Sequence, residues 1–186
     1  MVPVTSLAIP ILLSAVLVFL ASSVIHMVLG YHRSDLRKVP GETEVMEALR
    51  RFNIPPGDYA LPHAGSPSGM KSPEFIEKMQ KGPVAFVTFA PSGLPSMSAS
   101  LAMWFVYAVV VSGCAAYVAG RALGPGAPYL AVFRFAGTAA FLAYAMSLPQ
   151  NSIWWKKNWG TTLKTMFDGL VYASLTAGTF GWLWPR

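Results

Sequence analysis

The chain has 186 residues, of which 54% are hydrophobic and only 12% are charged, whereas a soluble domain carries about 25% charged residues. With a mean hydropathy of +0.46, this composition argues against a soluble globule, a disordered chain and a coiled coil. A single cysteine excludes an internal disulfide framework and a Cys-based zinc or iron–sulfur site. The net charge of +6 does not indicate nucleic-acid binding, because the bases flank apolar runs.

The first apolar run, Ile11–Leu29, contains no charged residue. About 20 apolar residues suffice for a helix to cross a hydrocarbon core roughly 30 Å thick. No Lys or Arg precedes Arg33, so the run lacks the basic start of a signal peptide. We therefore expect a transmembrane helix over about residues 11–29 that is retained in the mature protein.

Residues 31–100 are expected to form a cytoplasmic segment between the first and second membrane helices. The segment has eight Lys and Arg against seven Asp and Glu, the balance of a solvated region. Apolar residues recur at helical spacing over about residues 42–52, which predicts a short amphipathic helix. Ser72, a typical N-cap, predicts a second short helix over about residues 73–81.

Other parts of this segment are less regular. Ile54–Tyr59 and the Pro-, Gly- and Ser-rich stretch that follows are interpreted as loop. The apolar stretch Val84–Ala90 is too short to span a membrane, and it fits a strand, an interfacial segment or a re-entrant stub. The whole segment fits either a linker along the membrane surface or a module that docks a partner.

Three further apolar runs predict transmembrane helices over about residues 101–123, 129–148 and 166–184. The breaker Gly124–Pro128 predicts a tight antiparallel hairpin between the second and third of the four runs, and Pro149 is expected to close or kink the third helix. The predicted fold class is an all-α integral membrane protein with a single membrane domain. It is a four-helix transmembrane bundle with short amphipathic helices between helices 1 and 2.

Basic residues at the helix ends predict the orientation. Arg33, Arg37 and Lys38 follow the first run, and further lysines precede the fourth. These loops are therefore expected to be cytoplasmic, with both termini outside the cytoplasmic membrane of a bacterium.

Ionisable side chains inside membrane spans are expensive, so they are candidates for function. His26 and Asp168 are expected at the same depth, near the cytoplasmic ends of their helices, with Tyr107 and Tyr144 in the same layer. This set fits a proton-handling or ligand-binding cluster, or an ordinary polar clasp in which Asp168 pairs with Lys164. Arg134 lies near the opposite end of its helix, where it can reach toward the interface or contact an anionic head group.

No metal, cofactor or catalytic residue is predicted. Haem ligation by two histidines would need a second histidine inside the membrane, and His32 and His63 fall in the cytoplasmic segment. Cys114 lies in the middle of the second apolar run, where an apolar environment keeps a thiol inert.

Small residues at a spacing of four predict close helix packing. The fourth run has one such stripe, and the second run offers another. Such stripes fit packing within the chain or an interface with another subunit. Their members are Gly169, Ala173, Ala177 and Gly181 in the fourth run, and Ser112, Ala116 and Gly120 in the second.

Two stretches, Ile25–Asp35 and Phe167–Leu170 continuing to Phe180–Pro185, resemble an uncharacterised family of small bacterial inner-membrane proteins with four transmembrane helices. The resemblance covers most of the chain. It implies a bacterial membrane protein and no particular activity.

The function predicted from these features is non-catalytic. We expect an accessory, assembly or scaffold subunit of a larger membrane complex, with the lipid bilayer and other membrane subunits or further copies of itself as partners, and no nucleic acid. A small oligomeric transporter or channel that uses the layer of His26 and Asp168 is the alternative. A membrane enzyme that acts on a lipid or quinone is the third possibility.

Overall fold

The computed structural model describes all 186 residues and separates into two compact units. We call Met1–Leu36 together with Ser96–Arg186 the helical unit, and Arg37–Pro95 the inserted unit. The chain was expected to form one membrane domain with a loop segment. The segment is instead compact enough to form a unit of its own.

The helical unit is built from four long helical stretches. The first consists of the 3₁₀ turn η1 (Val4–Leu7), α1 (Ala8–Val24) and the π-helical turn η2 (Ile25–Leu29). After the 3₁₀ turn η3 (Tyr31–Ser34), the inserted unit intervenes. The remaining elements are α4 (Met97–Ala122), α5 (Tyr129–Phe141), the π-helical turn η5 (Leu142–Met146), α6 (Pro149–Trp155) and α7 (Trp159–Trp182).

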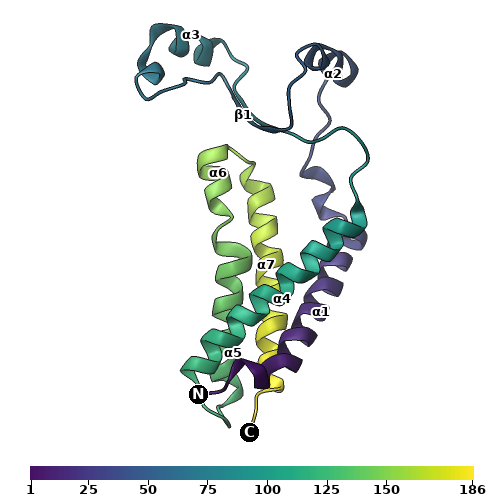
Figure 1. Cartoon of the computed structure of the whole chain (residues 1–186), viewed down its shortest axis with the longest axis vertical. Helices are drawn as coiled ribbons and strands as arrows, with labels where there is room; N and C mark the ends of the chain where they lie inside the picture. The colour runs from purple at the N-terminus through teal and green to yellow at the C-terminus, as the bar shows by residue number, and fades with distance from the viewer. The chain divides into compact units, whose positions relative to one another are not determined.

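These stretches pack side by side in alternating directions, with α7 against α5 and α1 (Figure 1). Backbone hydrogen bonds close one end, where Val2 N–H donates to the Gly120 carbonyl and Gly126 N–H to the Pro185 carbonyl, both at 2.8 Å. Both termini therefore lie at this end of the helical unit. The end of η2 and the start of α7 lie at the opposite end.

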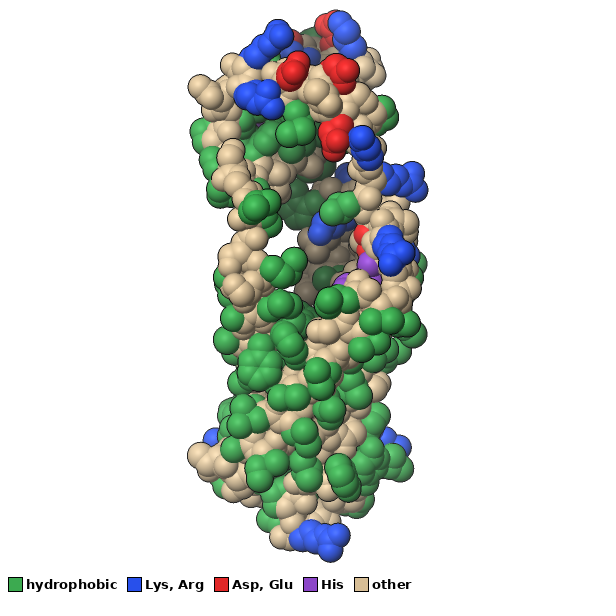
Figure 2. Space-filling model, turned by 90° about the vertical axis from the view of Figure 1, so that its right-hand side faces the viewer, with side chains coloured by type: hydrophobic (Ala, Val, Ile, Leu, Met, Phe, Trp, Pro, Cys, Tyr) green, Lys and Arg blue, Asp and Glu red, His purple; other side chains and the backbone are tan.

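Three helical stretches are long and apolar enough to cross a membrane: Val4–Leu29, Met97–Ala122 and Tyr129–Trp155. Large hydrophobic side chains such as Leu20, Val110 and Leu142 are exposed on these stretches. Hydrophobic side chains are spread over the visible face of the helical unit in Figure 2.

Of the two alternatives for Pro149, closing the third stretch is wrong, although a turn at Ser147 and Leu148 interrupts the helix directly before it. Pro149 is the first residue of α6, where a missing N–H breaks no helical hydrogen bond, so the stretch continues to Trp155.

The small-residue stripe of α7 packs inside the chain. A Cβ on Gly169 would lie 2.9 Å from the Ala145 Cβ, and a Cβ on Gly137 would lie 2.9 Å from the Ala177 Cβ. Only glycine at these positions lets α7 approach the third stretch so closely. Ala173 and Ala177 are buried in the same contact, and Gly181 touches the ring of Tyr129.

The stripe of α4 packs against the first stretch. Ser14 donates to Ser112 Oγ at 3.0 Å, and Gly120 faces the carbonyl of Val2. Ala116 is fully buried between these two contacts. Both predicted stripes therefore serve packing between helices of the same chain.

The inserted unit contains two short helices and a two-stranded antiparallel sheet. Helix α2 covers Glu42–Arg50 and α3 covers Pro73–Lys81, with Ser72 Oγ accepting from the Phe75 N–H as its N-cap. Strand β1 (Gly57–Leu61) pairs with β2 (Ala85–Phe89), in a register that sets Tyr59 opposite Val87.

The all-α prediction is therefore wrong in this unit. The interpretation of Ile54–Tyr59 as loop missed the start of β1, because Gly57 and Asp58 have low strand propensity and the pairing strand lies more than 20 residues away. Of the three alternatives for Val84–Ala90, the strand is correct. An apolar run of this length carries no periodicity that separates these alternatives.

Replacing Ala177 with Leu should lower the free energy of unfolding by about 1–3 kcal/mol, because the larger side chain has no space against Gly137. Denaturation of the purified chain in mixed detergent micelles measures this loss. Ser174→Leu is the matched control on the exposed face of α7. Equal stability of the two variants would show that the stripe is not a packing contact.

Candidate functional site

Asp168 is the centre of a polar cluster at the end of the helical unit opposite the termini. Its side chain is only 1% exposed, although it is the only acidic residue of helix α7. Tyr31 donates its hydroxyl to Oδ1, and the Nε2 atom of His32 lies 2.7 Å from Oδ2. Each carboxylate oxygen therefore has one partner from the segment that follows α1.

The path of the chain after α1 explains this contact. The wide turn η2 ends at Gly30, whose φ of 66° is in the left-handed region that glycine adopts without strain. The 3₁₀ turn η3 then spaces His32 and Asp35 by three residues on one face. In this way a short polar sequence is folded back onto α7.

His32 lies between two carboxylates. Its Nδ1 is 2.5 Å from Asp35 Oδ2, and its Nε2 is 2.7 Å from Asp168 Oδ2. Each ring nitrogen of His32 is therefore within hydrogen-bond distance of a carboxylate oxygen. Lys164 lies beside Asp35 and adds a cation to the cluster.

Lys164 anchors the same turn to α7. Its Nζ donates to the carbonyl of Tyr31 at 2.8 Å, to Ser34 Oγ at 2.9 Å and to Asp35 Oδ1 at 2.9 Å. In the polar clasp considered as one alternative, Asp168 pairs with Lys164, and this pairing is wrong. The long lysine side chain reaches across to η3, and Asp168 is left to the phenol and the imidazole.

These contacts shift two ionisation equilibria in the turn. Burial raises the pKa of Tyr31 to about 12, with a further contribution from its hydrogen bond to Asp168. The hydrogen bond from His32 lowers the pKa of Asp35, and Lys164 adds to this effect. At neutral pH the phenol therefore keeps its proton as a donor, and the carboxyl of Asp35 is ionised.

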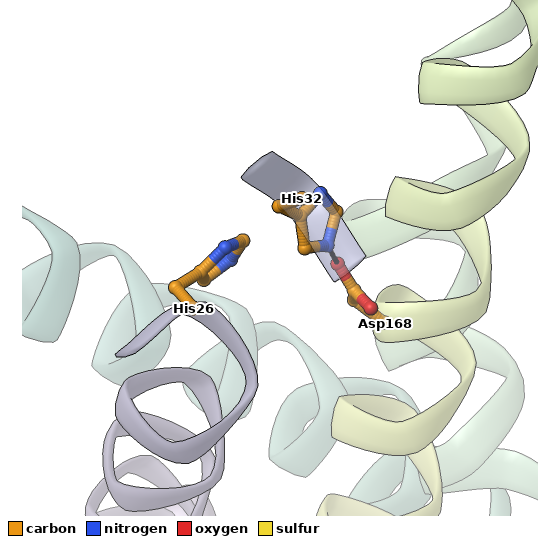
Figure 3. A group of neighbouring side chains, drawn as sticks. All are labelled: His26, His32 and Asp168. Carbon is orange, nitrogen blue, oxygen red and sulfur yellow. Dashed lines mark hydrogen bonds and ion pairs between the residues drawn. The ribbon is translucent and has the colours of Figure 1, made fainter. Parts of the chain in front are cut away.

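His26 joins the cluster through the ring of His32 and not through Asp168. The two imidazole centroids are 4.5 Å apart, and the His26 side chain is exposed, with no hydrogen bond to the protein. In Figure 3, His26, His32 and Asp168 come from three separate elements and gather around one point. One potential ligand atom from each lies within 4.8 Å of the others.

Tyr107 and Tyr144 lie in an aromatic group and not on the carboxylate. Their rings are 5.8 Å apart, and Tyr107 donates to the carbonyl of Ala143. Trp104 and Tyr172 complete the group, and the buried hydroxyls of Tyr144 and Tyr172 have no hydrogen-bond partner. A buried hydroxyl without a partner lowers the stability of a fold by about 1–3 kcal/mol. The aromatic group therefore has two hydroxyl donors whose burial is not compensated.

Arg134 is remote from this cluster, as the sequence predicted. Its side chain is exposed on α5, with no ion pair to Asp168. It borders an apolar cavity of about 560 Å³ that Cys114, Val118 and Leu142 also line. Contact with an anionic head group stays a prediction for this position.

Tyr31, His32 and Asp35, which contact Asp168 and Lys164, were not among the predicted site residues. They follow the apolar run, so they were placed in the solvated segment. Gly30 and the dense polar sequence directly after it were the available signal, since a left-handed residue at the end of a helix reverses the chain.

No protein-family model matches the chain, and the comparisons with curated proteins and with solved structures found no significant match.

Replacing Lys164 with Met should lower the free energy of unfolding by about 1–3 kcal/mol, because three hydrogen bonds from the ammonium group are lost. The loss should shrink in acid. The pKa of Asp35 is below its usual 3.8 in the folded state, so this pairing stabilises the fold above that pH and fades as Asp35 takes up a proton.

Lys157→Met is the matched control, because the Lys157 side chain is exposed and has no partner. Detergent denaturation at pH 7 and near pH 3 measures both variants. Equal losses in the two variants at pH 7 would contradict the anchoring role of Lys164.

Proposed function

We propose that the protein is an accessory or assembly subunit of a membrane complex, with the inserted unit as the part that binds the partner. The helical unit anchors it in the bilayer. The localisation that we propose is the cytoplasmic membrane of a bacterium, in keeping with the resemblance to uncharacterised inner-membrane proteins.

A fourth membrane span, α7, is part of this proposal. Helix α7 has 24 residues, long enough to cross a bilayer, and it packs along α5 and α1. Its buried carboxylate at Asp168 has a phenol and an imidazole as partners, which reduces the cost of placing it near a membrane interface.

Four spans would put both termini on one side, and we propose the outer side. Arg33, Lys156 and Lys157 gather at the end of the helical unit opposite the termini, together with Lys164. Such bases favour the cytoplasmic side. The inserted unit, which follows the same end of α1 in the chain, is then cytoplasmic.

The observation that carries the proposed function is that no residue of the inserted unit is buried, although it has 59 residues and regular structure. Large apolar side chains on α2 and after it stay exposed, with Phe52 73% exposed and Met46 55% exposed. Large apolar side chains that stay exposed on neighbouring residues favour an interaction surface.

The charge of the inserted unit favours a protein over an anionic membrane surface as the partner. It has seven Lys and Arg against six Asp and Glu, whereas membrane-binding amphipathic helices are rich in bases. Helix α2 has three glutamates, which anionic lipids would repel. A partner that supplies an apolar surface fits this balance better.

A groove within the inserted unit has the size and lining for an apolar side chain of such a partner. It has a volume of about 360 Å³ and lies between the sheet and α3, lined by Leu61, Pro62, Met70, Phe75, Met79 and Val84. A cavity of this size with apolar walls is typical of binding sites.

Replacing Met46 with Lys should remove a stoichiometric partner that co-purifies with the wild-type chain from native membranes in mild detergent. The reason is the loss of apolar contact on the exposed face of α2. Mass spectrometry of the intact complex measures the partner. Stability should change by less than about 0.5 kcal/mol, because the side chain is exposed.

Glu44→Gln is the control, since it changes the charge by the same amount about 200° around α2, on the opposite face, and should keep the partner. If the wild-type chain purifies alone, or only with copies of itself, the accessory function is wrong. A partner retained by Met46→Lys would place its contact away from this face.

A further inference from the structure

A second kind of site lies in the helical unit and is independent of the inserted unit. His26, His32 and Asp168 each offer a ligand atom, and these atoms lie within 4.8 Å of one another (Figure 3). Two imidazoles and one carboxylate are the ligands that Zn²⁺ and related divalent transition metals take in proteins. We propose that these three side chains bind a divalent transition-metal ion of the zinc type.

The neighbours of His32 and Asp168 already hold them as metal ligands are held. Asp35 accepts from His32 Nδ1 at 2.5 Å. The other ring nitrogen, Nε2, lies 2.7 Å from Asp168 Oδ2, and it would bind an ion once any proton between these two atoms is released to solvent. Tyr31 donates to Asp168 Oδ1, which leaves Oδ2 on the side of His32. A carboxylate behind a ligating histidine and a donor behind a ligating carboxylate are the usual second layer of a metal site.

The distances need only small side-chain rotations. Ligand atoms around a tetrahedral ion with bonds of about 2.0–2.1 Å lie roughly 3.3 Å apart. Here Nε2 of His32 and Oδ2 of Asp168 are 2.7 Å apart and must separate slightly, whereas His26 must approach. His26 is exposed and has no hydrogen bond, so it is free to turn.

The site is accessible to solvent on the side of His26 and buried on the side of Asp168. The side chain of Asp168 is 1% exposed and that of His32 is 13% exposed, whereas His26 faces outward. An ion can therefore meet His26 first and then the two buried ligands. Three protein ligands leave at least one coordination position open, as in catalytic and not in structural zinc sites.

The test is a titration of the full-length chain, freed of any histidine tag and of bound metal, with Zn²⁺ in detergent by calorimetry. We expect one ion per chain. His26→Ala should weaken this affinity at least 100-fold without lowering the melting temperature, because the exposed imidazole makes no hydrogen bond. Asp35→Asn should weaken it about 10–100-fold through the orientation of His32.

His63→Ala is the matched control, since it removes a histidine of the inserted unit and should leave the affinity unchanged. Co²⁺ in place of Zn²⁺ should give the visible absorption of a low-symmetry site in the wild type and lose it in His26→Ala. Mg²⁺, which prefers oxygen ligands, should not compete.

Absence of stoichiometric Zn²⁺ binding by the wild type would overturn the proposal. Equal affinities of His26→Ala and the wild type, or equal losses in His26→Ala and His63→Ala, would overturn it too. None of these outcomes bears on the partner that the inserted unit is proposed to bind.

Discussion

The buried carboxyl group of Asp168 needs hydrogen-bond partners, and this need determines the structure at the end of the helical unit opposite the termini. Asp168 is buried on α7, and an ionised carboxylate out of water is unfavourable unless opposite charge and hydrogen bonds compensate it. Both of its partners come from the turn after α1, more than 130 positions earlier in the chain. The compensation therefore fixes η3 on α7 and brings His26 into the same neighbourhood.

Close packing of small residues holds the rest of the helical unit together. Helices in a bilayer gain little from hydrophobic burial against one another, so they depend on short contacts and on interhelical hydrogen bonds. Gly137 on α5 and Gly169 on α7 permit such contacts between α7 and the third stretch. Ser14 with Ser112 adds a buried hydrogen bond between α1 and α4. Ser152 and Thr162 join α6 to α7 in the same way at 2.7 Å.

Features with a local cause could be predicted from the sequence. The apolar runs, the breaker between the second and third runs and the N-cap at Ser72 each depend on residues close to one another. Strand β1 could not be predicted, because its pairing partner β2 supplies the structure that Gly57 and Asp58 do not favour.

The candidate site was predictable only in part, for the same reason. Helix direction and depth were enough to place His26 and Asp168 near one another. The chain reverses at Gly30 and brings Tyr31 and His32 back onto α7. This reversal depends on tertiary contacts, such as that of Lys164 with the Tyr31 carbonyl, which the periodicity of the sequence does not reveal. The expected pair of His26 and Asp168 is therefore part of a larger cluster, in which Asp168 bonds to Tyr31 and His32.

The two proposals use separate parts of the chain and have separate physical reasons. The inserted unit has apolar surface without a core, which a partner protein would cover. The helical unit has preoriented ligands at one end, which an ion would join. A metal bound by His32 would also stabilise η3, the turn that precedes the inserted unit in the chain.

The central claim is that His32 compensates the buried charge of Asp168, and a double-mutant cycle between these residues tests it most directly. His32→Gln, Asp168→Asn and the double variant would be unfolded in mixed detergent micelles without metal. The account predicts a coupling free energy of about 1–3 kcal/mol, so that the double variant loses much less stability than the two single losses together. Losses that add to within about 0.5 kcal/mol would contradict it.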